Sequence, residues 1–199
     1  MTFVVSLIEF YRQTVRQVEA MLDGWFLGLL ARLVFLAVLL PYYINSALTK
    51  FDGPFSIADS AYYQIALPAV DAAGGDVSAV SIFPWGLMVL FGSYGEIILP
   101  LLLIAGLSTR IAALGMIGFI IVQTLTDVLV HNVDATTIGA LFDRFPDSVI
   151  LDQRLLWIFP LVYLAVKGGG LFSLDKLLCT VWTRRISAHK KSGRLSPTA

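Results

Sequence analysis

Four long runs of apolar residues alternate with polar stretches along the chain. They cover residues 25–48, 85–106, 111–130 and 148–167, and the last is the weakest because its purely apolar part is only 155–166. An α-helix rises ~1.5 Å per residue, so about 20 residues cross the hydrocarbon core of a bilayer. The pattern therefore predicts an all-α, polytopic membrane protein whose four transmembrane helices form an antiparallel bundle.

The segment before the first of these runs, residues 1–24, has a different pattern. Val4, Ile8, Tyr11 and Val15 recur at spacings of four and three, and the charged residues lie mainly elsewhere. This spacing is typical of an amphipathic helix with a narrow apolar stripe. We expect this helix to lie on the cytoplasmic membrane surface or against the bundle, as an anchor.

Two outer loops, 51–83 and 131–153, are too long to be bare connections. Residues 57–70 read as a short interfacial helix that ends near Pro68, and the first loop could form a lid over the mouth of the bundle. In the second loop, Asp134 is placed to cap a short helix that ends at residues 143–146. We therefore expect short helices in both outer loops.

Tight turns are predicted at two other places. Gly106 suits the C-terminal end of the second span, and Ser108 or Thr109 suits the N-cap of the third, so these two helices should form a hairpin. Three consecutive glycines, Gly168–Gly170, should end the fourth helix.

Composition supports a membrane protein. Hydrophobic residues make up 57% of the 199 residues and charged residues 14%, whereas soluble domains are nearer 45–50% and 25%. The single cysteine, Cys179, excludes an internal disulfide and a cluster held by several cysteines.

Basic residues are concentrated after the fourth span, where Asp175 is the only acid. The two outer loops carry a single basic residue, Arg144. The positive-inside rule then places both termini in the cytoplasm, as a multi-pass protein of the bacterial inner membrane. We expect 179–199 to be a basic cytoplasmic tail, without regular structure after Trp182, and we do not expect nucleic-acid binding. The basic residues of this region are Lys167, Lys176, Arg184, Arg185, Lys190, Lys191 and Arg194.

Two charged residues lie deep within the predicted spans. Glu96 is near the middle of the second apolar run, and Arg32 lies inside the first. A charge at such a depth costs about 2.5–3.5 kcal/mol on insertion scales, so Glu96 needs a partner. Arg32 is the expected partner. The pair could simply lock two helices together, or it could line a polar pocket that holds a quinone head group or a small anion.

A second polar group is expected near the outer ends of the helices. Asp127 and His131 are four residues apart on one helix face, and Arg154 lies on the outer turn of the fourth span. This group could be a solvated pair at a helix end, a proton relay or a weak metal site, and we predict no metal centre. Lys50, just past the first span, should snorkel to the outer surface, where it could meet Asp127 or Asp152.

The sequence shows no pattern for a tightly bound cofactor. The two histidines, His131 and His189, both lie outside the deep core, so no pair of haem ligands is present. We find no phosphate loop and no nucleophile with a base beside it. No catalytic residue is predicted, and whether the protein is an enzyme stays open.

These residues together resemble the DoxX family of small four-helix membrane proteins, over about residues 28–178. The resemblance rests on the order and spacing of several short motifs. These are Arg32, Lys50–Phe51, Gly95–Glu96, the stretch LLIAGLSTR at 102–110, and Gly168–Gly170 with LFSLD after it.

The resemblance implies a function as well as a fold. The family is related to DoxD, the membrane subunit of thiosulfate:quinone oxidoreductase, and other members are linked to redox and sulfur-stress complexes. It implies a DoxX-like membrane domain at 25–178, with Arg32, Lys50 and Glu96 as the functional set. Where the family often has a glycine before the lysine, this chain has Asn45–Ser46–Ala47.

Two functions are consistent with this. The first is a redox-linked subunit that interacts with a quinone or a sulfur species, receives electrons from a partner protein, and holds no other cofactor tightly. The alternative is a non-catalytic membrane scaffold or a carrier of small solutes or anions. The sequence leaves homo-oligomer formation open.

Overall fold

The computed structural model describes residues 2–53 and 55–192, and these residues form helices and no strand. This confirms the all-α prediction. Three helical segments are long and apolar enough to cross a membrane by length and composition: Phe26–Leu48, Ile82–Ala105 and Thr109–Leu129. Their bounds lie within three residues of the first three predicted spans. Many apolar side chains on these helices are exposed, for example Phe91 and Ile111, as expected for surfaces that face lipid.

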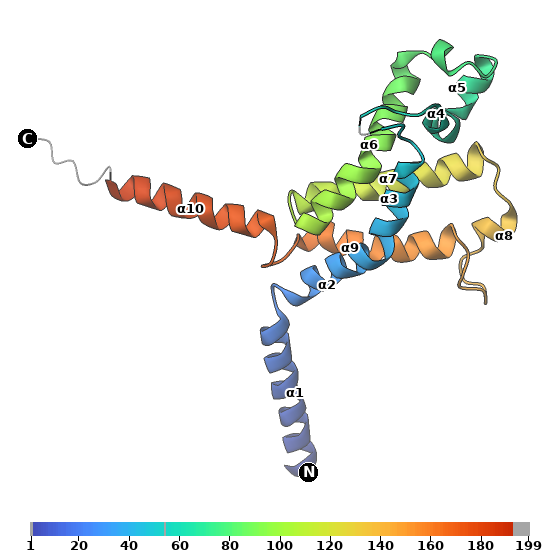
Figure 1. The fold of residues 1–199 in the computed structure, drawn as a ribbon. Helices are drawn as coiled ribbons and strands as arrows, with labels where there is room; N and C mark the ends of the chain where they lie inside the picture. Colours follow the sequence, from blue (N-terminus) through green and yellow to red (C-terminus); the bar gives the residue numbers. More distant parts are fainter. Residues whose placement is uncertain (1, 54, 193–199) are drawn as a thin grey trace, which may run out of the picture.

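The first span is one continuous helical segment with a change of direction. It consists of α2 (Phe26–Val34), a wide π turn (Phe35–Leu39) and α3 (Leu40–Leu48). Pro41 is the second residue of α3, so only Leu40 separates it from the wide turn. A proline within a helix lacks the N–H donor and crowds the preceding turn, which the wider turn accommodates. Figure 1 shows α3 leaving in a different direction from α2.

The second span, α6 (Leu87–Ala105), and the third, α7 (Thr109–Leu129), form the predicted hairpin. Gly106 ends α6 in the left-handed conformation, as expected (φ 68°). The N-cap position of α7 is as predicted, but the group that makes the capping bonds is not. Ser108 occupies the N-cap position without a side-chain cap bond, and Asp175 caps the helix from another segment, accepting from the backbone N–H of Ser108 (2.6 Å) and Thr109 (2.8 Å).

This cap affects the charge state of Asp175. Partial burial works to raise the pKa of its carboxyl, but hydrogen bonds from Thr109 and Ser108, and the positive charge of Arg32, outweigh burial. The pKa of Asp175 therefore lies below its usual range. A carboxylate at a helix N-terminus also interacts favourably with the helix dipole. Asp175 thus holds the start of α7 against the glycine-rich turn as an anion.

A further helix, α9 (Leu151–Lys167), has 17 residues and packs along α7 and α2 (Figure 1). It ends at Gly168 (φ 82°), within the predicted glycine turn. The core lies where these helices meet. It contains Phe35, Leu39 and Tyr43 from the first span, with side chains of α6, α7 and α9 packed against them. Those side chains include Leu103, Ala112, Ala113, Met116, Ile120, Leu161 and Leu164.

The two ends of the bundle differ. At one end, here named the tail end, α2 and α7 begin and α6 and α9 finish. It is tied by backbone bonds from Leu171 N–H to Gly24 O (3.0 Å) and from Asp175 N–H to Gly106 O (2.9 Å). The opposite end, the loop end, carries the short helices α4 (Asp59–Ile65), α5 (Leu67–Ala72) and α8 (Ala135–Ile138).

The short helices confirm part of the loop prediction. Residues 57–70 hold α4 and most of α5, and Asp134 caps α8 by accepting from the N–H of Thr136 and Thr137. The helix predicted to end at 143–146 stops much earlier. Gly139 ends it with a backbone conformation that non-glycine residues avoid (φ 76°).

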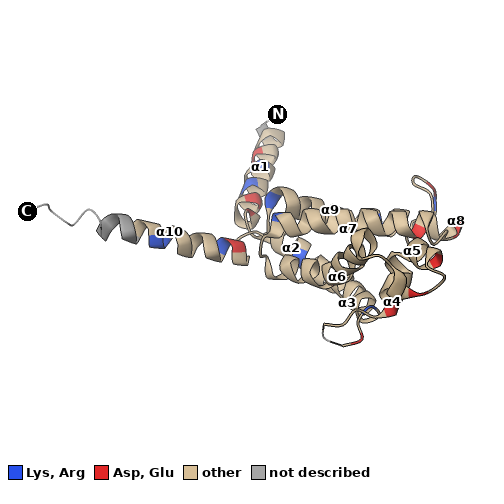
Figure 2. Ribbon diagram, turned by 90° about the horizontal axis from the view of Figure 1, so that it is seen from above, with Lys and Arg blue, Asp and Glu red and all other residues tan. Residues whose placement is uncertain are grey.

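Helices also extend from the tail end, away from the bundle (Figures 1 and 2). The first is α1 (Thr2–Leu22), in the segment predicted to be an amphipathic helix. The second is α10 (Leu174–Ser192). The expectation of an unstructured chain after Trp182 was therefore wrong for residues 183–192, because no glycine or proline interrupts the helix before Gly193. The rest of the predicted tail, 193–199, lies outside the described residues.

Candidate functional site

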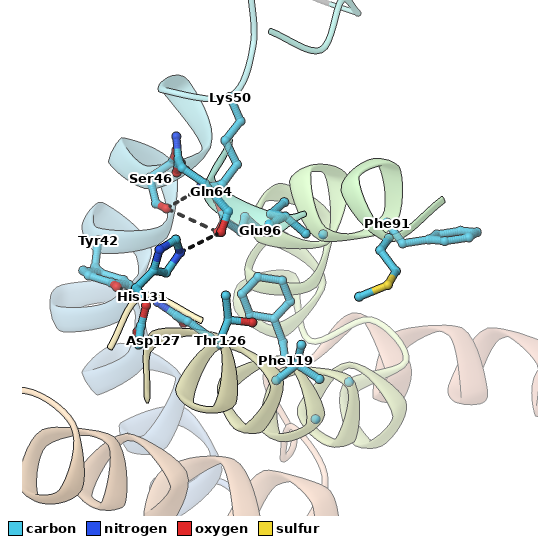
Figure 3. A pocket seen from close by; sticks show the side chains of 17 residues that line it. Tyr42, Ser46, Lys50, Gln64, Phe91, Glu96, Phe119, Thr126, Asp127 and His131 are labelled. Carbon is cyan, nitrogen blue, oxygen red and sulfur yellow. Dashed lines mark hydrogen bonds and ion pairs between the residues drawn. The ribbon is translucent and has the colours of Figure 1, made fainter. Parts of the chain in front are cut away.

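The most buried ion pair joins Lys50 and Glu96. Lys50 follows the end of α3, and Glu96 lies in the middle of α6. The Lys50 Nζ is 2.9 Å from Glu96 Oε2, and the two side chains are 4% and 5% exposed. Glu96 thus has the basic partner that its depth requires, and that partner is Lys50 (Figure 3).

The expected pairing of Arg32 with Glu96 was wrong. The Arg32 guanidinium instead donates to backbone carbonyls at the tail end: Leu103 (3.1 Å), Ile104, Gly169 (3.4 Å) and Phe172 (2.7 Å). The last carbonyls of a helix have no partner within it and carry the negative end of its dipole. Arg32 lies level with the last turn of α6, two turns from Glu96, and satisfies these carbonyls.

Ser46 completes the buried pair. Its hydroxyl accepts from Lys50 Nζ (2.8 Å) and donates to Glu96 Oε1 (3.2 Å), and its carbonyl also accepts from Lys50 (3.2 Å). The three N–H bonds of the ammonium therefore have three acceptors, counting Glu96. Ser46 belongs to Asn45–Ser46–Ala47, the three residues found here at the place where the DoxX family often has a glycine.

A second ion pair lies between α7 and α9. Arg154 pairs with Asp127 and donates to Thr124 Oγ1 (2.8 Å). The Arg154 side chain is 6% exposed and that of Asp127 is 27%. The contacts suggested for Lys50 with Asp127 or Asp152 do not form, because Glu96 takes the ammonium. Asp152 instead accepts from the backbone N–H of Ser148 (3.0 Å) at the start of α9.

His131 joins the loop end of α7 to the short helix α4. Its Nε2 lies 3.0 Å from the carbonyl oxygen of Gln64, so an N–H at Nε2 donates to that carbonyl. In the part of the chain that the structure describes, no three His, Cys, Asp or Glu side chains group closely enough to hold a metal ion. His131 therefore acts here as a contact between α4 and α7.

The Lys50–Glu96 pair and the residues Asp127 and His131 border one cavity. It lies between α3, α4, α6 and α7 and has a volume of about 560 Å³ (Figure 3). Of the residues predicted from the sequence, Lys50, Glu96, Asp127 and His131 line it. Arg32 and Arg154 do not. The remaining polar side chains of its lining are Tyr42, Ser46, Gln64, Gln123 and Thr126.

The other walls of the cavity are apolar or made of glycine. Gly118 on α7 is the most open of them, since a Cβ added there would meet no atom within 4 Å. Phe91 lines the cavity and is 71% exposed on the outer surface of α6, so the cavity reaches the surface that faces lipid. The apolar lining consists of Ile65, Met88, Phe91, Phe119 and Val122.

Among the described residues of the lining, one buried polar atom has no partner. Gln123 donates from Nε2 to the Tyr42 hydroxyl (2.7 Å), but its Oε1 is buried and accepts no hydrogen bond within the described chain. A buried acceptor without a partner costs free energy. A ligand hydroxyl in the cavity would supply the missing donor. Gln123 lies four residues before Asp127 and eight before His131, so helical spacing could have placed it in the site.

The arrangement suits a neutral, mostly apolar ligand that has a few polar atoms. The charges at the cavity are already paired within the protein, so they do not call for a charged ligand. The polar side chains come from α3, α4, the middle of α6 and the loop end of α7, and apolar side chains such as Phe91 lie toward the lipid. Such a mixture is typical of small-molecule sites, whose volumes run from about 300 to 1,000 Å³.

The sequence model of the DoxX family matches residues 27–132, which hold α2 to α7 and the loop helices α4 and α5. The glycine turn and the segment after it lie outside the matched residues. No curated protein and no solved structure shows a significant match to the chain.

Proposed function

Because the chain belongs to the DoxX family of membrane proteins, we propose that it is the membrane subunit of a redox assembly and binds a quinone or quinol in the cavity between α3, α4, α6 and α7. The observation that carries this proposal is the cavity itself. It combines a lipid-facing apolar wall with a buried polar wall, at a volume of about 560 Å³. A quinone likewise has a polar part and an apolar part, namely the oxygens on its ring and its apolar chain.

The polar side chains give such a ring its orientation. Gln123 Oε1 accepts from a quinol hydroxyl, which supplies the donor that this buried oxygen lacks. Lys50 and Glu96 keep the polar wall rigid, since each is hydrogen-bonded to the other and to Ser46. The apolar chain leaves past Phe91 into the lipid. A quinone supplies the capacity to carry electrons, and a partner protein would deliver them.

Transport of a small anion is less well supported. An anion site needs a cation with free N–H groups, but the three donors of Lys50 are committed to Ser46 and Glu96. Displacing Glu96 from Lys50 would leave a carboxylate unpaired in a buried position, which costs several kcal/mol. The paired state of Lys50 therefore favours a neutral ligand.

We also propose that α9 is a fourth span and that both termini are cytoplasmic. At ~1.5 Å per residue its 17 residues extend about 26 Å, near the thickness of the hydrocarbon core. Arg154, near its loop end, is paired with Asp127, which lowers the cost of placing this charge in the membrane. The excess of basic residues after α9 favours the cytoplasm.

Cysteine labelling tests this orientation. Cys179 on α10 is exposed and is the single cysteine of the chain. A membrane-impermeant maleimide should label Cys179 in permeabilised cells and leave it unlabelled in intact spheroplasts. The Thr14→Cys/Cys179→Ser variant, which moves the cysteine to α1, should behave alike. Opposite accessibility of the two positions would mean an odd number of spans and would contradict α9 as a span.

The proposed ligand site is tested by filling the cavity. Gly118→Leu places a side chain in open space, and leucine is favoured over glycine inside a helix by roughly 1 kcal/mol. The variant should therefore fold normally. The quinone content of the purified protein, measured by chromatography of an organic extract, should fall at least about fivefold, because the leucine occupies the volume of the ring.

Leu125→Phe is the matched control. It adds bulk to the same helix at a position that is 52% exposed and does not line the cavity. Its quinone content should equal that of the wild type at matched lipid content. Equal quinone in Gly118→Leu and in the control would place any bound quinone elsewhere and leave the cavity without this function.

A further inference from the structure

A second cleft lies at the tail end of the bundle, on the far side from the cavity described above. It has a volume of about 610 Å³ and is formed by the start of α7, the glycine turn and the start of α10. Its lining includes three basic side chains from three different elements: Arg110, Lys167 and Lys176. The Arg110 Nε lies against Gly168, 3.6 Å from where a Cβ would be, so this side chain packs over the glycine turn.

The three cations have no acidic partner in the described residues. The ion pairs found there are Lys50–Glu96 and Arg154–Asp127. Asp175 is the acid in the cleft lining, and its two oxygens accept from Ser108 and Thr109. The carboxylate is therefore used to cap α7, and the cleft keeps an excess of positive charge.

Two of these cations occupy positions that a helix disfavours. Arg110 is in the first turn of α7 and Lys176 in the first turn of α10. The positive end of the helix dipole lies there, so a cation at this position is destabilising. An anion bound between them would offset both the dipole and the mutual repulsion of the three charges.

The surroundings of the cleft indicate that this anion belongs to a lipid. Ile111 and Leu171 line the cleft and are 74% and 51% exposed. Apolar side chains also recur along α10 at helical spacing and are all exposed: Leu174, Leu177, Leu178, Val181, Trp182 and Ile186. Basic residues accompany this stripe, and an amphipathic basic helix of this kind lies in the headgroup region of a bilayer. Figure 2 shows acidic residues gathered at the opposite, loop end.

We propose that the cleft binds the phosphate of an anionic phospholipid, with Arg110, Lys167 and Lys176 around the phosphate and the acyl chains beside Ile111 and Leu171. Basic pockets at the ends of transmembrane helices recognise anionic headgroups in this way. The bound lipid joins α7, α9 and α10, and α10 lies in the same interface.

Lipid binding to the detergent-purified full chain, followed by native mass spectrometry, tests the proposal. Phosphatidylglycerol should bind at one molecule per chain, and more tightly than phosphatidylcholine. The Arg110→Gln/Lys176→Gln variant should bind phosphatidylglycerol about tenfold more weakly. Arg184→Gln/Arg185→Gln removes the same charge from the exposed part of α10 outside the cleft, and should change binding by less than about twofold.

Three results would overturn the proposal. These are equal weakening in the two double variants, equal binding of the zwitterionic lipid, and displacement of the lipid by millimolar inorganic phosphate, which would make the cleft a site for free phosphate. Lys167→Gln provides a second variant that keeps both first-turn residues, and it should weaken binding in the same direction. The readout is independent of quinone content, so it does not depend on the function proposed for the other cavity.

Discussion

Replacing Lys50 with methionine is expected to destabilise the protein by about 3–5 kcal/mol, because it leaves Glu96 buried without its cation. Glu96 is 4% exposed, and only Ser46 would remain as a partner. The measurement is thermal unfolding in detergent, followed with the fraction of monodisperse protein. Arg12→Met, at an exposed position on α1, serves as the control and should change stability by less than about 0.5 kcal/mol.

The double variant Lys50→Met/Glu96→Gln separates charge from packing. Replacing both members of a buried pair with neutral groups is often close to neutral in free energy, whereas removing one member is not. The double variant should therefore recover most of the stability that the single variant loses. Equal instability of the single and double variants would show that the pair stabilises the fold by something other than mutual neutralisation.

Replacing Arg32 with alanine is expected to have an effect of comparable size at the other end of the bundle. A hydrogen bond to a charged group contributes about 1.5–3 kcal/mol. The bonds to Leu103 O (3.1 Å) and Phe172 O (2.7 Å) alone therefore make the expected loss about 3 kcal/mol or more. The stability of Arg32→Lys should lie between that of the wild type and that of Arg32→Ala. One ammonium cannot reach all the carbonyls that the planar guanidinium contacts.

Hydrogen exchange shows where this loss acts. Amides of residues 168–176 should lose protection in Arg32→Ala, while those around Glu96 should keep theirs, since Arg32 does not contact the buried pair. Arg16→Ala, at an exposed position on α1, is the control. Loss of protection around Glu96, with the glycine turn unchanged, would mean that Arg32 acts on the pair after all.

The helices could be predicted well from apolar runs, and the pairing of charges less well. The length and hydropathy of each run determine the first three spans to within a few residues. The pairing of Arg32 with Glu96 was predicted from their similar depths in the membrane. That comparison assumes straight helices whose axes are aligned. The wide turn before Pro41 changes the direction of α3, and this direction brings Lys50, eighteen residues after Arg32, to Glu96 instead.

Contacts made by loop segments also could not be predicted from the sequence. Gln64 reaches the cavity because α4 folds back against α6, and no periodicity within the chain specifies such a return. Asp175 caps α7 from sixty-six residues away, so the local rule that favoured Ser108 or Thr109 could not find it. Gln123 is different, since its place on the face of Asp127 and His131 is visible in the sequence.

If the cavity between α3, α4, α6 and α7 holds a quinone, an azido-quinone added to native membranes should label the residues around it. Photo-labelling followed by peptide mapping measures this. We expect saturable labelling on α6 near Phe91 and on α7 near Gly118, competed by unlabelled quinone and reduced in Gly118→Leu. Labelling that is spread over the lipid-facing helices, that unlabelled quinone does not compete, and that Gly118→Leu leaves unchanged would show that the cavity does not hold a quinone.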